Sequence, residues 1–272
     1  MSRTWTKSIP TLVVWGLLTT LSAAEPVQLT RAEQERFLAT AKVVKTKGAP
    51  SGITGSLRAT LSDGAVTHDA HIQTIDEEKV QFQTIQGTEM NFRDTYKFNI
   101  AAYRLDKMLD LGMTPPSIER SYMGKHAAFT WWVDDVMMME GERLKKKIQA
   151  PDADSWNQQM YIVRIFDQLI FNVDRNLGNL LIAKDWKLWM IDHTRAFRLH
   201  NTLKEVKNLG KCDRSLYEKL KTLDAPALAS EMGDYLRTNE IKGLLARRDK
   251  IVQHFDKRGD SAFYTIAART ER

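Results

Sequence analysis

The sequence predicts an α+β protein with two lobes, a small β-rich N-terminal lobe and a mostly helical C-terminal lobe. Extended runs rich in β-branched residues, with turn signals between them, gather in the first half of the chain around one long helix. Apolar residues at helical spacing dominate the second half, where a short hairpin is expected to interrupt the helices. We expect the N-terminal lobe to cover residues 25–126 and the C-terminal lobe residues 127–272.

The bulk composition is that of an ordinary globular protein. The chain has 272 residues, 43% of them hydrophobic and 27% charged, which is enough for one large domain or two small lobes with a shared core. A formal net charge of +6 suits a partner that carries phosphate or carboxylate. No basic run is interleaved with stacking aromatic residues, so we expect no nucleic-acid partner. The single cysteine, Cys212, excludes an internal disulfide.

Residues 1–24 have the three-part pattern of a secretory signal peptide. Arg3 and Lys7 give a positive start, residues 12–21 form an apolar run, and residues 22–24 are small. The apolar run is shorter than the roughly 20 residues that span a bilayer. We therefore expect cleavage after Ala24 and no integral membrane span in the mature chain. The predicted location is periplasmic, secreted or in the lumen of a secretory pathway.

The N-terminal lobe is expected to begin with a helix and a glycine-rich loop. Residues 30–33, Thr-Arg-Ala-Glu, form a capping box and predict a helix that runs through about residue 44. Gly48, Gly52 and Gly55 then punctuate a polar loop.

Two extended runs, residues 56–61 and 66–75, are predicted to pair as a hairpin. They meet at Asp63-Gly64, a pair that favours tight hairpin turns because both turn positions need a positive φ. Residues 79–85 fit a third strand or a loop equally well, since periodicity does not decide such a short run.

The remaining elements are predicted from apolar spacing and from breaker residues. A helix is expected over residues 94–111, ended by Gly112 and Pro115-Pro116, and a buried strand over the aromatic run at 127–133. The elements expected after these are a helix over residues 155–171, two short strands at 180–182 and 187–191, and helices from about 216 to 255 with breaks near Pro226 and Thr238.

Three polar residues, Asp174, Asn179 and Asp192, mark the part of the chain that suggests chemistry. They occur in the order helix, polar loop with an Asp and an Asn five residues later, hairpin, and a second Asp after an apolar strand. Phosphoryl transfer from ATP needs such a set, because one carboxylate orients the attacking hydroxyl while an amide oxygen and a second carboxylate hold the metal ion. Mg²⁺ prefers these hard oxygen ligands. Taken singly, each residue also fits a polar loop with capping side chains or the end of a strand.

The motif Asp-Arg-x-x-x-Asn, followed by Ile-Asp and then by an Arg and a Phe, resembles the catalytic core of the atypical kinases. That group includes phosphatidylinositol 3- and 4-kinases, HipA-type bacterial kinases and the Golgi type of secretory-pathway kinases. The resemblance covers residues 94–120 and 160–200, and the second stretch carries the specific motif. It implies a two-lobed protein-kinase-like fold with the catalytic loop in the C-terminal lobe.

The resemblance also implies a role for each residue of the motif. Asp174 would be the catalytic base or would orient the acceptor hydroxyl, and Arg175 would organise the catalytic loop by pairing with a carboxylate. Asn179 and Asp192 would be the metal ligands. The implied cofactors are ATP and Mg²⁺ or Mn²⁺, and the implied partner is a hydroxyl-bearing protein, lipid or small molecule.

The sequence departs from the kinase pattern in the N-terminal lobe. Kinases of this kind have a Lys on a first-lobe strand that contacts the phosphates and pairs with a Glu on the following helix. The expected strand, residues 70–75, has no Lys, and Asn99 occupies the expected Glu position. We assign Gln73 on this strand to the nucleotide site. Candidates for the missing charges are His71, Lys79 and Lys97 (positive) and Glu89 and Asp94 (negative).

Two further contacts with the nucleotide are predicted. Gly52 and Gly55 would cradle phosphate through backbone N–H groups, and the alternative is that they serve simply as turns. Trp132 lies where a connection between the lobes would run and would border the adenine. The alternative for Trp132 is a place among ordinary core aromatic residues.

The sequence therefore favours an exported atypical kinase-like phosphotransferase that moves the γ-phosphate of ATP to a hydroxyl. The missing Lys and Glu keep a second hypothesis open, a pseudokinase or nucleotide-binding scaffold without transfer. A variant of the first hypothesis is transfer of AMP, with the nucleotide in a flipped orientation. A third hypothesis is a purely structural exported domain.

Overall fold

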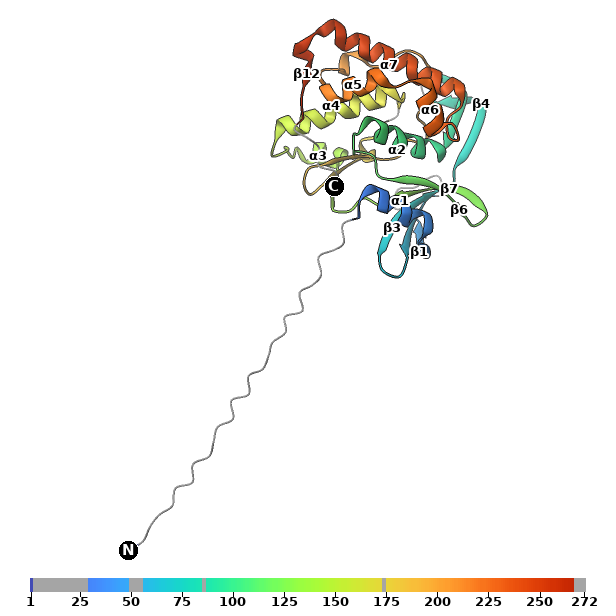
Figure 1. The fold of residues 1–272 in the computed structure, drawn as a ribbon, viewed down its shortest axis with the longest axis vertical. Coiled ribbons are helices and arrows are strands. Elements are labelled where there is room, and N and C mark those ends of the chain that lie inside the picture. The colour runs from blue at the N-terminus through green and yellow to red at the C-terminus, as the bar shows by residue number, and fades with distance from the viewer. Residues whose placement is uncertain (2–28, 49–55, 85–86, 173–174, 267–272) are drawn as a thin grey trace.

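A computed structural model describes residues 1, 29–48, 56–84, 87–172 and 175–266 of the chain. Figure 1 shows two lobes, a β-rich one built around a five-stranded sheet and a larger one made mostly of helices. The two-lobed α+β fold predicted from the sequence is therefore confirmed. The expected signal peptide, apart from Met1, falls outside the described residues. Within the described part of the chain, none of the helices has the length and apolar character to cross a membrane.

The α-helices of the described residues are α1 (Arg31–Thr40), α2 (Lys97–Leu109), α3 (Glu140–Lys146), α4 (Ala153–Leu169), α5 (Arg214–Thr222), α6 (Ala225–Met232) and α7 (Thr238–Arg258). The strands are β1 (Lys42–Gly48), β2 (Leu57–Ser62), β3 (Thr67–Gln73), β4 (Asp76–Thr84), β5 (Gly87–Thr95), β6 (Ser117–Tyr122), β7 (Lys125–Trp131), β8 (Val136–Met139), β9 (Leu180–Ala183), β10 (Leu188–Met190), β11 (Cys212–Asp213) and β12 (Phe263–Tyr264). The 3-10 helices are η1 (Leu177–Asn179), η2 (Val206–Asn208) and η3 (Asp260–Ala262).

The five-stranded sheet has one apolar face and one polar face. Its strands are antiparallel and lie in the order β1-β2-β3-β7-β6. Because side chains alternate along a strand, one face packs against α1 in a small core. Members of this core are Phe37, Leu38, Ala59, Leu61, Ala70, Ile72 and Phe129. The opposite face, here called the cleft face, carries Arg58, Thr60, His71 and Gln73, which alternate with the core residues of β2 and β3.

Strand β7 belongs to this sheet along its whole length. It pairs with β3 on one side and with β6 on the other. The lobe boundary expected at residue 126 would therefore cut a hydrogen-bonded strand. We propose that the first lobe ends after Trp131 and that residues 132–135 connect it to the second lobe.

Helix α1 begins as predicted and ends early. Thr30 Oγ1 accepts the N–H of Glu33 at 3.3 Å, and the Glu33 carboxylate accepts the N–H of Thr30 at 2.8 Å, which completes the capping box. The helix ends at Thr40 rather than at residue 44. Residues 42–48 form β1 instead, because their two valines favour extended backbone and β2 supplies hydrogen-bond partners.

The turn between β2 and β3 differs from the tight one predicted. The strands pair up to Ser62 and Thr67, which leaves a loop of residues 63–66. Asp63 Oδ1 accepts the N–H groups of Ala65 and Val66 at 2.9 and 2.8 Å. Only Gly64 of the predicted pair has a positive φ, +96°. The Asp side chain thus closes the loop, so no second residue needs the left-handed region.

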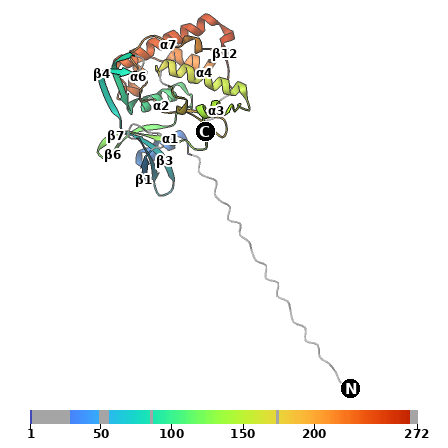
Figure 2. The same ribbon diagram turned by 180° about the vertical axis from the view of Figure 1, so that it is seen from behind.

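Strands β4 and β5 form a long hairpin that reaches the helical lobe, where Figures 1 and 2 show β4 beside α6. Of the undecided run at residues 79–85, residues 79–84 belong to β4, and residue 85 lies outside the described residues. Arg237, at the start of α7, pairs with Glu78 at 2.6 and 2.7 Å. Arg93 on β5 pairs with Glu240 in a buried position. Most residues of β4 and β5 are charged or polar, so the sequence shows no alternation of apolar and polar residues that would predict this hairpin.

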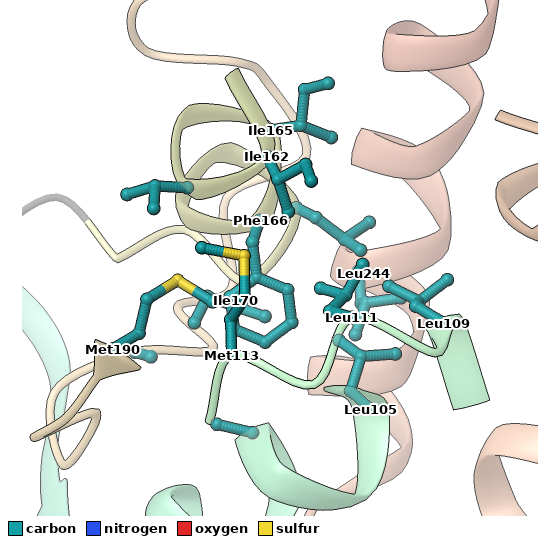
Figure 3. Close-up of a cluster of buried hydrophobic side chains, with 14 of the residues drawn as sticks. Leu105, Leu109, Leu111, Met113, Ile162, Ile165, Phe166, Ile170, Met190 and Leu244 are labelled. Atoms are coloured by element: carbon teal, nitrogen blue, oxygen red, sulfur yellow. The ribbon is translucent and has the colours of Figure 1, made fainter. Parts of the chain in front are cut away.

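Helix α2 packs into the core of the helical lobe. Figure 3 shows Leu105 and Leu109 of α2 beside Phe166 of α4 and Leu244 of α7. Met190 of β10 closes the same cluster from the side of the β9–β10 hairpin. Helix α2 is therefore the element that joins the first lobe to the core of the second.

A buried carboxylate fixes the turn that follows α2. Asp106 is fully buried and accepts the N–H groups of Gly112, Met113 and Thr114 at 3.1, 2.8 and 2.8 Å. Arg31 of α1 donates to the same carboxylate at 2.9 Å. Asp106 thus ties α1, α2 and the segment leading to β6 together.

We expect Asp106→Ala to lower the free energy of unfolding by about 3 kcal/mol, because three backbone donors and a guanidinium lose a buried partner. Urea unfolding measures the change. Asp249→Ala, which removes an exposed carboxylate from α7, serves as the control and should cost less than about 1 kcal/mol. An Asp106 variant no weaker than this control would contradict the assignment.

Candidate active site

The polar loop after α4 is held at both of its described ends by one carboxylate. Asn172 donates from its backbone N–H to the carbonyl of Asp167 at 2.8 Å and from Nδ2 to the Asp167 carboxylate at 3.1 Å. Arg175 binds the same carboxylate from the other end. Asp174, the predicted catalytic residue, lies between these two anchors and outside the described residues.

Arg175 uses all five of its N–H groups on the protein. It donates to Asp167 at 3.0 Å from Nε and at 2.7 Å from Nη2. Nη1 donates to the carbonyl oxygens of Asn179 and Ile191 at 3.3 and 2.8 Å. Nη2 also lies 3.1 Å from Nε2 of His193. The expected pairing with a carboxylate is observed, and the guanidinium joins the loop to the end of β10.

The two predicted metal ligands meet at this point. Asn179 ends η1 and Asp192 follows β10; Nδ2 of Asn179 lies 3.4 Å from Oδ2 of Asp192. The N–H of Ile191 donates to the carbonyl of Asn179 at 3.0 Å, which fixes the two segments side by side. Asp192 has a left-handed φ of +55° and is exposed, and Thr194 Oγ1 binds its other oxygen at 3.3 Å. The pair offers an amide oxygen and a carboxylate, the donor types that Mg²⁺ and Mn²⁺ take.

His193 is a neutral, buried part of the same turn. Its side chain is 1% exposed and lies edge-on to Phe166. Burial holds the pKa of His193 well below its ordinary value, and the adjacent Arg175 guanidinium adds to this effect. Since Nε2 faces the Nη2 donor of Arg175, the ring accepts there and carries its proton on Nδ1.

A neutral amide pair joins β3 to α2, at the two positions where the kinase pattern predicts a Lys and a Glu. Gln73 on β3 and Asn99 on α2 are buried, and Nδ2 of Asn99 donates to Oε1 of Gln73 at 2.6 Å. Oδ1 of Asn99 accepts the backbone N–H of His193 at 2.7 Å. The cleft face of β3 is thereby connected to the Asp192 turn through α2.

The residues proposed to replace the missing positive charge are committed elsewhere or neutral. Lys97 pairs with Asp76 at 3.3 Å, and Lys79 pairs with Glu77 at 3.0 Å. Burial lowers the pKa of His71 below its ordinary value, which outweighs the opposing effect of the Asp192 carboxylate. His71 is therefore neutral at neutral pH.

The residues proposed to replace the missing negative charge differ in position. Glu89 pairs with Arg198 at the edge of the hairpin. Asp94 lies near the Asp192 turn, and burial raises its pKa above the ordinary value while the Thr194 hydrogen bond and Arg195 oppose the rise. The Asp192 carboxylate adds to the rise. Asp94 therefore belongs to the surroundings of the predicted metal pair.

Trp132 borders the cleft, whereas its neighbour Trp131 belongs to the core. Trp131 is buried beside Phe37 and stacks on His68 at 3.6 Å. Trp132 is partly exposed in the connection between the lobes, and the Arg58 guanidinium lies 4.1 Å from its ring centroid. A hollow of about 60 Å³ adjoins Arg58 and Thr60 on the same sheet. The predicted phosphate-binding glycines, Gly52 and Gly55, precede β2 in the sequence and fall outside the described residues.

A larger hollow, of about 430 Å³, lies between β5 and the segment after Phe197. Residues 87–91 and 198–200 line it. Its second wall is joined to the end of α4, because the N–H of Phe197 donates to the carbonyl of Ile170 and the ring of His200 stacks on Phe171 at 4.7 Å. We call it the hairpin hollow.

Sequence reasoning missed Asp167 and the double role of Asn99. Asp167 sits on α4 seven residues before Asp174, and an acid in the last turn of a predicted helix that leads into a polar loop was an available signal. Both bonds of Asn99 reach across the sequence, 26 residues back and 94 residues on, so local spacing gives no sign of them.

The fold is shared with solved kinase structures. The structure of hydra Fam20 with sugar superposes with a TM-score of 0.61 at 14% identity, over 86% of this chain and 92% of that chain. The Golgi casein kinase with Mn/ADP bound gives 0.56 at 13% identity, over 86% and 78%. The proinflammatory kinase CtkA of Helicobacter pylori gives 0.51 at 10% identity, over 80% and 96%.

These likenesses show that the chain has the kinase-like fold of the atypical kinases that its motif resembles. At such identities the shared property is the fold. No protein-family model matches the sequence, and no curated protein matches it.

We expect acidification below about pH 6.5 to destabilise the protein through His193. The pKa of His193 in the folded protein lies well below the 6.5 of an unperturbed histidine. At pH values between these two pKa values, only the unfolded chain binds the proton. The contribution to stability is therefore complete above about pH 6.5 and is lost as the pH falls, by up to about 1.4 kcal/mol per pH unit. Urea unfolding at a series of pH values measures the slope.

His193→Gln should flatten this slope. His126→Gln, at an exposed position on β7 where the ring lies 2.8 Å from the Glu119 carboxylate, is the comparison for a surface histidine, and the slope should persist in it. A slope that survives in the His193 variant would assign the acid sensitivity to another group, of which His71 is the first candidate.

Proposed function

We propose that this protein is an ATP-dependent, kinase-like phosphotransferase that moves the γ-phosphate of ATP to a hydroxyl-bearing substrate with Mg²⁺ or Mn²⁺. The observation that carries the proposal is the meeting of Asn179 and Asp192 beside a loop that Arg175 holds. The described residues contain no cluster of three or more His, Cys, Asp or Glu side chains for a metal. This suits an ion that completes its coordination with phosphate and water.

Each residue would contribute by its position. Asp174, in the loop that Asp167 closes, would accept a hydrogen bond from the acceptor hydroxyl and orient it. Asn179 and Asp192 would hold the metal ion, which when bound neutralises charge on the phosphate oxygens. Arg175 has no donor left for a substrate, so it would act as a positioning residue rather than as a catalytic one.

The solved neighbours support the choice of cofactors. One of them is the Golgi casein kinase with Mn/ADP bound, a nucleotide and a divalent ion in the same fold. The signal-peptide pattern of residues 1–24 supports export of the chain. The sequence has no basic run interleaved with stacking aromatic residues, which supports an acceptor other than nucleic acid.

The hairpin hollow is our candidate for the acceptor site. Phe171, against which His200 stacks, precedes Asp174 by three residues in the chain. A volume of about 430 Å³ falls in the usual range for small-molecule sites. Thr88, Asn91 and His200 supply hydrogen-bonding groups in its wall.

We expect His200→Ala to raise the KM for the acceptor about tenfold, because the wall loses a ring that is stacked in place. Transfer of label from γ-labelled ATP to proteins, sugars and lipids provides the assay. His126→Ala is the matched control on the other lobe. An unchanged KM would place the acceptor elsewhere.

We expect ATP with Mg²⁺ or Mn²⁺ to stabilise the native protein by about 2–4 kcal/mol at saturation, since a ligand that binds only the native state shifts the unfolding equilibrium. Thermal unfolding with nucleotide, with metal and with both measures this effect. The metal-dependent part should vanish in Asp192→Ala, and Asp249→Ala should behave as wild type. An unfolding temperature that none of these ligands changes would contradict the proposal that the protein is an enzyme.

Asp174→Ala separates binding from chemistry. It should keep the nucleotide-dependent stabilisation and lose label transfer by about 10²–10⁴-fold, the usual contribution of a positioned acid or base. Full transfer in this variant would show that Asp174 has been given the wrong role.

A second candidate is a pseudokinase, a nucleotide-binding scaffold without transfer. The neutral Gln73–Asn99 pair favours it, because it replaces the charged pair on which transfer depends in protein kinases. Nucleotide-dependent stabilisation without label transfer to any acceptor would decide for this candidate. An acceptor that gains the mass of one adenylate instead of one phosphate would show AMP transfer.

A further inference from the structure

The side chain of Asn99 links three parts of the cleft through one amide. Oδ1 accepts the backbone N–H of His193, and Nδ2 donates to Oε1 of Gln73. Asn99 is 7% exposed and Gln73 is 4% exposed, so both bonds are shielded from water. Helix α2, strand β3 and the turn after Asp192 therefore depend on the same two hydrogen bonds.

The backbone decides which way both amides point. A main-chain N–H can only donate, so the Asn99 atom that faces His193 has to be the oxygen. The Asn99 nitrogen then faces Gln73, and the Gln73 atom that meets it has to be an oxygen. The orientation of the Gln73 amide is thus set by His193, the residue next to Asp192.

This orientation leaves the Gln73 nitrogen free for a ligand. Among the described residues Oε1 of Gln73 accepts from Asn99, and Nε2 has no hydrogen-bond partner. Gln73 lies on the cleft face, the face that also carries His71 opposite Arg58. A buried side chain with one outward donor is a preorganised site for an acceptor oxygen.

The donor is uncharged, and Lys97, Lys79 and Arg58 are each held by a carboxylate. Lys97 and Lys79 are paired with Asp76 and Glu77. Arg58 on β2 is held by Asp69. The phosphate oxygens of a nucleotide would therefore meet an amide at the point where kinases present an ammonium group.

We propose that Asn99 is a positioning residue that turns the Gln73 amide so that its N–H groups bind the nucleotide phosphates. The inference rests on the nucleotide site of the proposed function. It adds that the first lobe binds phosphate through a neutral donor. The orientation of this donor is set by the hydrogen bonds from His193 to Asn99 and from Asn99 to Gln73. A nucleoside such as adenosine has no phosphate, so this donor adds nothing to its binding.

Gln73→Glu tests the donor directly. A glutamate keeps an oxygen toward Nδ2 of Asn99, so the internal bond survives, while an anionic oxygen replaces the outward N–H groups. We expect affinity for ATP and ADP to fall about tenfold or more, and affinity for adenosine to stay unchanged. Titration calorimetry with Mn²⁺ present measures all three. Gln253→Glu, an exposed site on α7, controls for the added charge.

Asn99→Asp tests the relay. An aspartate accepts the His193 N–H but cannot donate to Gln73, so the Gln73 amide turns over and presents its oxygen to the cleft. ATP affinity should fall about tenfold or more. The double variant Gln73→Lys with Asn99→Asp restores a donor toward the cleft and a partner behind it, and should recover ATP binding to within about threefold of wild type.

The outcomes separate the inference from the proposed function. A wild-type protein that binds no nucleotide removes the proposed function and the inference with it. A wild type that binds ATP, with single variants that bind it equally well, overturns the inference alone. A parallel loss of ATP and adenosine affinity, without recovery in the double variant, shows a structural role for the pair and also overturns it.

Discussion

The candidate site depends on one ion pair, between Arg175 and Asp167. Both side chains are nearly buried, with exposed fractions of 11% and 12%, so removing either partner would leave a poorly solvated charge. The fork of the guanidinium binds the carboxylate with two nitrogens and still reaches two carbonyl groups and a histidine. Lysine has one nitrogen and cannot make this set of bonds. Asn172 after α4, Asn179 in η1 and Ile191 after β10 are thus all bound to this one ion pair.

Helix α2 connects this part of the second lobe to the first lobe. Its apolar side packs against α4 and α7, as Leu105 and Leu109 do in Figure 3. Its polar side chains form hydrogen bonds with other elements. Asn99 binds β3 and the Asp192 turn, and Asp106 binds Arg31 of α1. The β4–β5 hairpin adds ion pairs to α7. The first sheet is therefore attached to the second lobe by directional bonds on two sides, which fixes the cleft face opposite the predicted metal pair.

The charge distribution of the cleft follows from these attachments. Asp94 and Asp192 stand near one another, while Lys79 and Lys97 are paired with Glu77 and Asp76. Under the proposed function, phosphate charge would be balanced mainly by the metal ion, with Gln73 contributing direction rather than charge. The net positive charge of the whole chain adds only a general attraction for anions, which screening limits to a range of roughly 10 Å at ordinary ionic strength.

The sequence by itself determined the elements that local rules control. Apolar spacing predicted α4 and α7, the capping box predicted the start of α1, and the Asp–Asn–Asp order predicted the motif and its kinase-like fold. The fold alone decided where long-range bonds go: β1 in place of a longer helix, the pairing of β4 with β5 and of β6 with β7, and the partners of Arg175 and Asn99. The physical reason is that strand pairing and buried hydrogen bonds join residues far apart in the chain, whose complementarity leaves no period in the sequence.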